Sequence, residues 1–297
     1  MNEAIAARAQ ISLVSQESRY LFRLGGDEDV ETAMTENLDP REGSLTTRPT
    51  AADRARALLD PARCRGLVPH DAGYLQTAGI EIPATRGFGQ QLMRTRFYAG
   101  VYQLGRPIGL RVASALQAPG RDEDRARTAR SLRLRPGHTV LDIACGPGNF
   151  TGTYGHAVGR DGLAIGLDAS HPMLRRAVAD NPGPAVAYLS GDAENLPFRD
   201  GVADAVSCLA ALYLINEPFR AIEEMARVLV PGGRIVLLTS LAPGGRRDRP
   251  HVMVMERLST MRMFGRDEIT DFLRALGFDE IEQVTAGLAQ TVTATKR

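Results

Sequence analysis

Cysteine is scarce in this chain, which holds only Cys64, Cys145 and Cys208 among its 297 residues. Cysteines so few and so scattered make no disulfide framework, and without a Cys-x-x-Cys pair they offer no complete zinc site. Apolar runs long enough to cross a membrane, ~18 residues, are also absent, so we expect no membrane span. The opening MNEAIAARAQ has no basic segment followed by an apolar run, which argues against a signal peptide. We therefore expect a cytoplasmic protein.

An excess of charge of one sign is missing as well. The chain has 36 basic and 35 acidic residues, a formal net charge of +1, and Lys296 is its one lysine. Proteins that coat nucleic acid carry a basic excess, so this balance argues against nucleic acid as a partner. Hydrophobic residues make up 43% of the chain, which is ordinary for a globular protein.

Composition and turn signals divide the chain near residues 85 and 136. We expect an irregular N-terminal extension over residues 1–85, a helical cap over 86–135 and an α/β domain over 136–297. Within the extension we expect a helix over residues 2–23, a short helix over 51–59 capped by Thr50, and a small hairpin within 64–84. The cap should hold helical pieces over 87–117 and 122–134, the first interrupted by Gly105-Arg106-Pro107.

From residue 139 onward, short apolar segments alternate with amphipathic ones. This alternation predicts an α/β fold, with a mostly parallel sheet covered by helices on both faces. The expected strands are residues 139–144, 163–168, 185–190, 203–209, 234–240, 280–286 and 290–295. The expected helices are residues 149–158, 171–179, 217–229 and 267–276. A short turn at Gly287 joins the last two strands, so the final strand should run antiparallel to its neighbour.

A glycine-rich turn follows the first of these strands. Gly146 and Gly148 remove side chains where a ligand must approach the backbone, and the helix that follows presents free N–H groups. Asp142, just before the turn, suits an ammonium group and would be unfavourable against a pyrophosphate. Asp168 ends the second strand about 20 residues after the last glycine, where a ribose-binding acid belongs. Asp192 ends the third strand and could accept from an adenine amino group or serve as an ordinary turn residue.

Four stretches resemble the successive motifs of class I S-adenosylmethionine-dependent methyltransferases of the small-molecule type, which include the ubiquinone/menaquinone C-methylases. They are VLDIACGPGNFT, AIGLDAS-HPML, GDAENLPF and RVLVPGGRIVL, in this order along the chain. The resemblance covers about residues 135–297. It implies a Rossmann-like, seven-stranded, mostly parallel sheet with strand order 3-2-1-4-5-7-6, and S-adenosyl-L-methionine as cofactor.

The resemblance also implies which residues contact that cofactor. Asp142 and the turn with Ala144, Cys145, Gly146 and Gly148 would lie against its methionine part. Asp168 would hold the ribose hydroxyls, Ala169 and Met173 would flank the adenine, and Asp192 and Ala193 would contact the adenine edge. Leu209 would face the sulfonium.

The segment over residues 92–111 resembles a subgroup of these enzymes with a tyrosine-containing helix before the first motif. Tyr102 matches that tyrosine, which could cap the cofactor. The subgroup often carries a zinc ribbon at its N-terminus, but here Cys64 and His70 are all that remains of the ligands, so no metal is expected. The resemblance leaves residues 1–85 unexplained.

Methyl transfer requires a base only when the acceptor must lose a proton. The candidates are His251 and Tyr213. His251 lies in the insertion of about residues 241–265, which commonly lines the acceptor pocket in the family that the chain resembles, and Tyr213 follows the fourth strand. For His251 a purely structural role stays open. The four methionines in residues 251–264 suit either an adaptable apolar lid or a packed amphipathic helix.

The expected acceptor is a small, largely apolar molecule such as a quinone, lipid or secondary metabolite. The Asn/Asp-Pro-Pro-aromatic signature of enzymes that methylate base amino groups is absent. Three alternatives remain: a non-methylating reaction such as cyclisation on the same fold, an rRNA or tRNA methyltransferase, and a cofactor-binding scaffold. A homodimer is one candidate assembly.

Overall fold

The computed structural model describes residues 48–79, 121–245, 252, 256 and 261–297. The chain divides into the units Met1–Arg48 and Pro49–Arg297, and the described architecture belongs to the second. The helices expected over residues 2–23 and 87–117, and the boundary expected near residue 85, lie outside the described residues.

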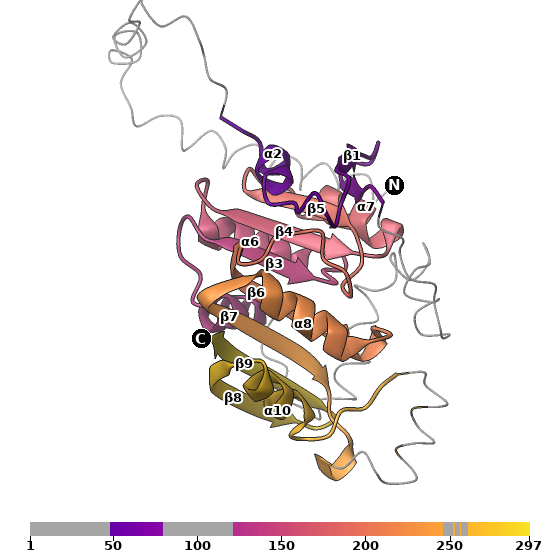
Figure 1. Ribbon diagram of the computed structural model, residues 1–297, viewed down its shortest axis with the longest axis vertical. Helices are drawn as coiled ribbons and strands as arrows, with labels where there is room; N and C mark the ends of the chain where they lie inside the picture. The colour runs from indigo at the N-terminus through magenta and orange to yellow at the C-terminus, as the bar shows by residue number, and fades with distance from the viewer. Residues whose placement is uncertain (1–47, 80–120, 246–251, 253–255, 257–260) are drawn as a thin grey trace, which may run out of the picture. The chain divides into compact units, whose positions relative to one another are not determined.

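A single mixed sheet organises the described part of the chain (Figure 1). Its strands are β1 (Leu67–Pro69), β2 (Leu75–Thr77), β3 (Thr139–Ile143), β4 (Leu163–Asp168), β5 (Val186–Ser190), β6 (Ala203–Leu209), β7 (Leu229–Ser240), β8 (Phe278–Ala286) and β9 (Ala289–Lys296). They lie in the order β1-β2-β5-β4-β3-β6-β7-β9-β8. β9 runs antiparallel to both β7 and β8, as the turn at Gly287 predicts.

The strand order predicted from the resemblance is found in β5-β4-β3-β6-β7-β9-β8, but the predicted count of seven is wrong for this sheet. The hairpin expected within residues 64–84 forms as β1 and β2 and then joins the sheet. Leu75 pairs with Leu189 and Gln76 with Ser190, in parallel register. The last two residues of β5, which would otherwise be part of an open edge, are thereby paired.

Helices cover both faces of the sheet. They are α2 (Ala51–Arg56), α5 (Arg121–Ser131), α6 (Asn149–Val158), α7 (His171–Asp180), α8 (Pro218–Val228) and α10 (Glu268–Ala275). Leu141 and Ile143 of β3 belong to the core cluster that contains residues of α2, α8 and α10, whereas Val140 packs with α6. This alternation of side chains along one strand shows which helices lie on each face.

The first described segment is fixed by local capping and by long-range bonds. Thr50 caps α2 through a capping box with Asp53, as the sequence predicts, although α2 ends at Arg56 rather than at residue 59. Arg54 of α2 donates to the carbonyl oxygens of Arg160, Asp161 and Gly162. The segment before the α/β motifs is therefore tied to the turn that precedes β4.

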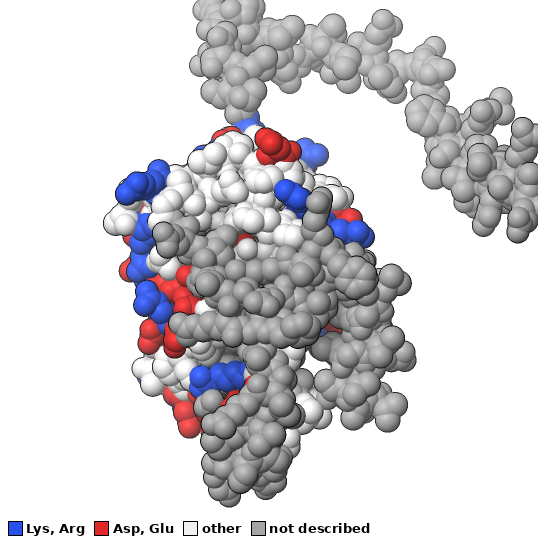
Figure 2. All heavy atoms as spheres, turned by 90° about the vertical axis from the view of Figure 1, so that its right-hand side faces the viewer, with Lys and Arg blue, Asp and Glu red and all other residues white. Residues whose placement is uncertain are grey.

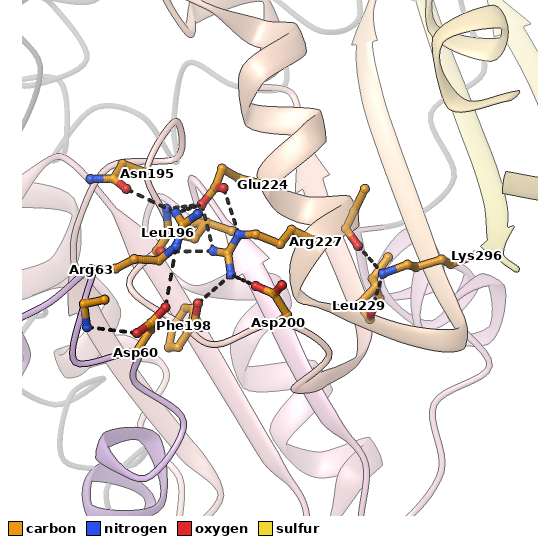
Figure 3. A network of polar contacts seen from close by, with 12 residues as sticks. Asp60, Arg63, Asn195, Leu196, Phe198, Asp200, Glu224, Arg227, Leu229 and Lys296 are labelled. Carbon is orange, nitrogen blue, oxygen red and sulfur yellow. Dashed lines mark hydrogen bonds and ion pairs between the residues drawn. The ribbon is translucent and has the colours of Figure 1, made fainter. Parts of the chain in front are cut away.

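The end of α8 is capped by a side chain from the last strand. Lys296 Nζ donates to the carbonyl oxygens of Ala226 and Leu229, at 2.7 and 2.8 Å (Figure 3). A cation at this position satisfies carbonyl groups that have no partner within the helix. In the described part of the chain, no helix combines the length and the apolar character needed to cross a membrane.

Candidate functional site

A crevice opens at the carboxyl ends of the central parallel strands. The strand order reverses at β3, which has β4 on one side and β6 on the other. In open α/β sheets, ligands bind at such a switch point. The crevice has a cavity volume of about 170 Å³ and is open to solvent on one side. Pockets for ligands of drug size occupy roughly 300–1,000 Å³, so the enclosed part of the crevice would surround only a portion of a nucleoside-sized ligand.

The glycine turn between β3 and α6 forms one wall. Gly148 has φ 74° at the N-cap of α6, and a Cβ there would lie 2.5 Å from Tyr188 Oη. Gly146 has φ 55°, and a Cβ there would meet no atom within 4 Å, because this glycine faces open space. Gly148 is thus required because Tyr188 packs against it beneath the turn. Gly146 leaves open space on the side of the turn that faces the crevice.

Two small residues with unusual backbone angles mark the same edge of the sheet. Ala144 follows β3 and Ala210 follows β6, and each has a φ of 56°. A non-glycine residue in this region costs energy and is held there by its surroundings. Both residues line the crevice, whereas Arg133 and Glu280, which also have positive φ, do not, so two of these four positions lie at the candidate site.

The side chains of Asn181, which follows the last residue of α7, and of Tyr188 in β5 hold the turn from behind. Tyr188 Oη donates to the carbonyl oxygen of Asn181 at 2.8 Å, and Asn181 Nδ2 donates to the carbonyl oxygen of Pro147, also at 2.8 Å. These two hydrogen bonds fix the turn, and the side chains that form them do not occupy the crevice.

Asp142 is a buried carboxylate at the floor of the crevice, with 2% of its surface exposed. It accepts hydrogen bonds from Thr151 Oγ1 at 2.6 Å and from Ser207 Oγ at 2.9 Å. Burial raises its pKa from 3.8 to about 6, although the two hydroxyl donors oppose the shift. A cationic group nearby would stabilise the ionised form.

Asp168 ends β4, and Asp192 lies two residues beyond the end of β5, at the same edge of the sheet. Asp168 accepts from the backbone N–H of Gly146 at 2.8 Å and of Ser170 at 2.7 Å, so it joins the glycine turn to the start of α7. Asp192 accepts from the N–H of Glu194 at 3.0 Å and begins a tight turn closed by the Asn195 N–H. Each carboxylate is held at the crevice by backbone donors.

The charges around the crevice have one sign. Its lining includes the carboxylates of Asp142, Asp168, Asp192 and Glu194, and no lysine or arginine among the described residues that form it. A ligand with an ammonium or sulfonium group suits this wall, whereas a phosphate group does not.

Most of the residues expected at a cofactor site meet here. The lining includes Asp142, Ala144, Cys145, Gly146, Asp168, Ala169, Met173, Asp192, Ala193 and Leu209. Gly148 lies beneath the turn. Tyr213 belongs to the short helical turn Leu212–Leu214 and packs against the main core, while Leu214, Ile215 and Asn216 line the crevice. Tyr102 and His251 lie outside the described residues.

The sequence analysis missed several lining residues. They are Pro147, Asn149, Phe150, Leu167, Ser170, Gly191, Glu194, Ala210, Ala211, Leu214, Ile215 and Asn216. Two of them, Gly191 and Ala210, directly follow the last residues of β5 and β6, a position that could have been used to find them.

Cys64 and His70 have separate local roles in this structure. The Cys64 thiol donates to the carbonyl oxygen of Gly66 at 3.0 Å. His70 Nδ1 accepts from the N–H of Ala72 at 3.0 Å, and its ring stacks on Tyr74 at 4.2 Å between centroids. Among the described residues, no group of three or more His, Cys, Asp or Glu side chains is arranged to hold a metal ion.

Comparisons with known proteins agree with this architecture. Residues 141–237 match the family model described as a methyltransferase domain. Demethylmenaquinone methyltransferase from Bacillus cereus is 34% identical over 122 residues, which cover 40% of this chain and 52% of the relative. The chain thus spans about half the length of this curated relative.

Two solved structures share the fold at low identity. Phosphoethanolamine N-methyltransferase 2 from Haemonchus contortus, solved with phosphomonomethylethanolamine and S-adenosylhomocysteine, has a TM-score of 0.57 and 16% identity, covering 72% of this chain and 61% of its own. The [4+2]-cyclase SpnF has a TM-score of 0.53 and 20% identity, covering 74% of this chain and 99% of its own. Residues 141–237 thus match a methyltransferase domain, and the α/β unit resembles demethylmenaquinone methyltransferase in sequence.

Proposed function

We propose that the protein is an S-adenosylmethionine-dependent methyltransferase acting on a small, largely apolar molecule. The observation that carries this proposal is the acidic crevice at the switch point of the sheet, with its open glycine turn. Its carboxylates suit the positive charges of this cofactor, and the matched methyltransferase domain supports the same assignment.

The resemblance and the geometry together support a role for each acid. Asp142 would attract the cofactor's ammonium group, Asp168 would bind the ribose hydroxyls, and Asp192 would accept from the adenine amino group. Ala169 and Met173 would flank the adenine. Leu209, at the end of β6, would face the sulfur.

When bound, the cofactor supplies a methyl group already activated by a positively charged sulfur. The chain's own task is to align the acceptor with that methyl group and to exclude water. Phe150, Leu214 and Ile215 offer apolar surface on the wall beyond the glycine turn. We propose Tyr102 as a cap over the cofactor, and His251 or Tyr213 as the base if the acceptor must lose a proton.

The apolar side chains in the crevice lining and the mixed charges on the outer surface both favour a small apolar acceptor over nucleic acid. In Figure 2, acidic and basic side chains are interspersed on the visible described surface, without a field of one sign. Nucleic-acid binding draws on such a basic field, so a small molecule is the better candidate. The demethylmenaquinone methyltransferase relative suggests a quinone precursor as the first acceptor to test.

For the assembly of the protein we propose a homodimer.

Transfer of labelled methyl groups tests the proposed activity. Full-length protein would be incubated with S-adenosylmethionine carrying a tritiated methyl group, together with demethylmenaquinone or an apolar metabolite extract. We expect label in the organic phase, accompanied by S-adenosylhomocysteine. Calorimetric binding of S-adenosylhomocysteine without transfer to any fraction would refute the methyltransferase assignment and leave cofactor binding intact.

A non-methylating reaction is the second candidate, favoured by the likeness of fold to the [4+2]-cyclase SpnF. The two candidates differ in what becomes of the methyl group. Product formation without stoichiometric S-adenosylhomocysteine would select the cyclase-like reaction.

The raised pKa of Asp142 predicts a pH-dependent affinity for the cofactor product. Because the folded pKa is about 6, the ionised fraction rises roughly tenfold between pH 5 and pH 7. S-adenosylhomocysteine should therefore bind more tightly at pH 7, by up to about tenfold.

The stability of the ligand-free protein should respond to pH in the opposite direction, because ionisation of buried Asp142 destabilises the folded state. The folded pKa of this carboxyl group exceeds its unfolded value, so the stability that it contributes falls as pH rises from about 4 to about 6.

Calorimetry at pH 5, 6 and 7 measures this dependence. Asp142→Asn is the control, because it keeps the size of the side chain and removes the titration. An identical pH profile in the variant would show that Asp142 does not tune the affinity.

A further inference from the structure

Residues 50–79, which we call the N-terminal strap, contact the turn that carries Asp192. The strap includes α2, β1 and β2 and lies outside the matched methyltransferase domain. Its strand β2 pairs with β5, and Thr77 Oγ1 donates to the carbonyl oxygen of Ser190 at 2.8 Å. Ser190 is the last residue of β5. The strap thus holds the start of the turn, two residues before Asp192.

The strap also holds the far end of the same turn. The N–H of Asp60 donates to the carbonyl oxygen of Pro197 at 2.9 Å, and the N–H of Arg199 donates to the carbonyl oxygen of Leu58 at 3.0 Å. Leu59 and Phe198 form an isolated antiparallel bridge. Both ends of residues 191–198, the adenine-side turn, are therefore bonded to one preceding segment.

Arg63 of the strap reaches the middle of the adenine-side turn (Figure 3). Its Nη1 lies 2.9 Å from Glu224 Oε2 and 3.4 Å from Asn195 Oδ1. The same Glu224 oxygen accepts the N–H of Leu196 at 2.9 Å, and Arg227 donates to both oxygens of this carboxylate. The exposed fractions of the Glu224 and Arg63 side chains are 11% and 31%, so the bond between them is partly shielded from water.

The adenine-side turn connects these contacts to Asp192. The N–H of Asn195 donates to the carbonyl oxygen of Asp192 at 3.3 Å, and the two residues form an isolated bridge. Arg63 touches the side chain of Asn195 and, through Glu224, the backbone of Leu196. Movement of Arg63 would therefore be passed to the residue proposed to read the adenine amino group.

We propose that Arg63 is a positioning residue for recognition of the cofactor's base, through its bonds to Asn195 and Glu224. The inference rests on the proposed function. Arg63 does not line the crevice, and its effect is exerted through the geometry of Asp192 and Ala193. An arginine suits this place because Nη1 reaches both Glu224 and Asn195 while Nε lies 3.7 Å from Asp60 Oδ2, a spread of contacts that the single ammonium group of a lysine does not cover with the same geometry.

The test compares two ligands that differ only at the base. S-adenosylhomocysteine carries an exocyclic amino group on the base, which S-inosylhomocysteine replaces with a carbonyl oxygen while its ring N1 becomes an N–H, so only the first ligand can donate to Asp192 from the exocyclic position. The wild-type protein should prefer S-adenosylhomocysteine by about tenfold or more, because a lost hydrogen bond to a charged group has roughly that effect. Arg63→Ala should reduce this preference to about threefold or less. Calorimetry on the full chain measures both affinities.

Matched variants separate positioning from stability. Arg56→Ala removes an exposed ion pair with Asp53 in the same strap and should leave the preference unchanged. Arg63→Lys keeps a charge beside Glu224 and therefore keeps the fold, so it decides the question if Arg63→Ala does not fold. In that variant we expect a preference between those of the wild type and Arg63→Ala.

The outcomes distinguish the inference from the function on which it rests. Equal weakening of both ligands, or an unchanged preference in Arg63→Ala and Arg63→Lys, overturns the positioning role while leaving cofactor binding in place. A wild-type protein that binds both ligands equally also overturns it. A wild-type protein that binds neither ligand overturns the proposed function as well.

Discussion

Replacing Gly148 with alanine is expected to lower the free energy of unfolding by about 2–5 kcal/mol. Two physical costs add. The φ of 74° is unfavourable for a residue with a Cβ, and the new Cβ would lie 2.5 Å from Tyr188 Oη and 2.8 Å from the tyrosine ring. Tyr188 cannot move freely, because its hydroxyl is bonded to the carbonyl oxygen of Asn181. Urea denaturation followed by circular dichroism measures the change.

Gly137→Ala is the matched control for this substitution. Gly137 has φ 89°, but a Cβ there would meet no atom within 4 Å. It should show the backbone cost alone, about 1–2 kcal/mol. If Gly148→Ala were no more destabilising than Gly137→Ala, the contact with Tyr188 would not be limiting.

Replacing Asp168 with alanine should weaken the binding of S-adenosylhomocysteine by at least about 100-fold. Under the proposed function, this carboxylate accepts two ribose hydroxyl groups, and hydrogen bonds to a charged group contribute about 1.5–3 kcal/mol each. The variant also loses the acceptor for the N–H groups of Gly146 and Ser170. Isothermal titration calorimetry measures the affinity.

Asp204→Ala is the comparison for Asp168→Ala. Asp204 Oδ2 accepts the N–H of Thr139 at 2.8 Å, at the opposite end of the sheet from the crevice. This variant loses a carboxylate and a strand-linking bond, so its stability should fall while its affinity for the ligand stays the same. A similar loss of affinity in both variants would mean that Asp168 acts through stability rather than through contact with the ribose.

The elements nearest the glycine turn could be predicted from the sequence because their signals are local. β4, β6 and α6 have the bounds that were expected. The carboxylates of Asp142, Asp168 and Asp192 also meet at one crevice, since the carboxyl ends of parallel strands share one edge of the sheet. In such a fold, the residues that end the strands can be identified from the sequence, and these residues locate the crevice.

Long-range pairing could not be predicted in the same way. β1 and β2 have three residues each, too few for a periodic pattern, and the parallel pairing with β5 joins distant parts of the chain. The bond between Arg63 and Glu224 spans 161 positions. β7 begins at Leu229 rather than at residue 234, because the chain continues as strand through Pro231-Gly232-Gly233 with a shift in register against β6.

The cap on α8 offers a way to observe this protein through one lysine side chain. Lys296 is the one lysine of the chain, and its Nζ lies on the last carbonyl groups of α8. Reductive methylation with ¹³C-formaldehyde would place isotopic methyl labels on Lys296 and on the N-terminal amine, whose resonances are assigned by comparison with Lys296→Arg. The helix also carries Glu224 and Arg227, which belong to the network around the adenine-side turn. One lysine resonance would therefore report whether filling the crevice is felt at the far end of that helix.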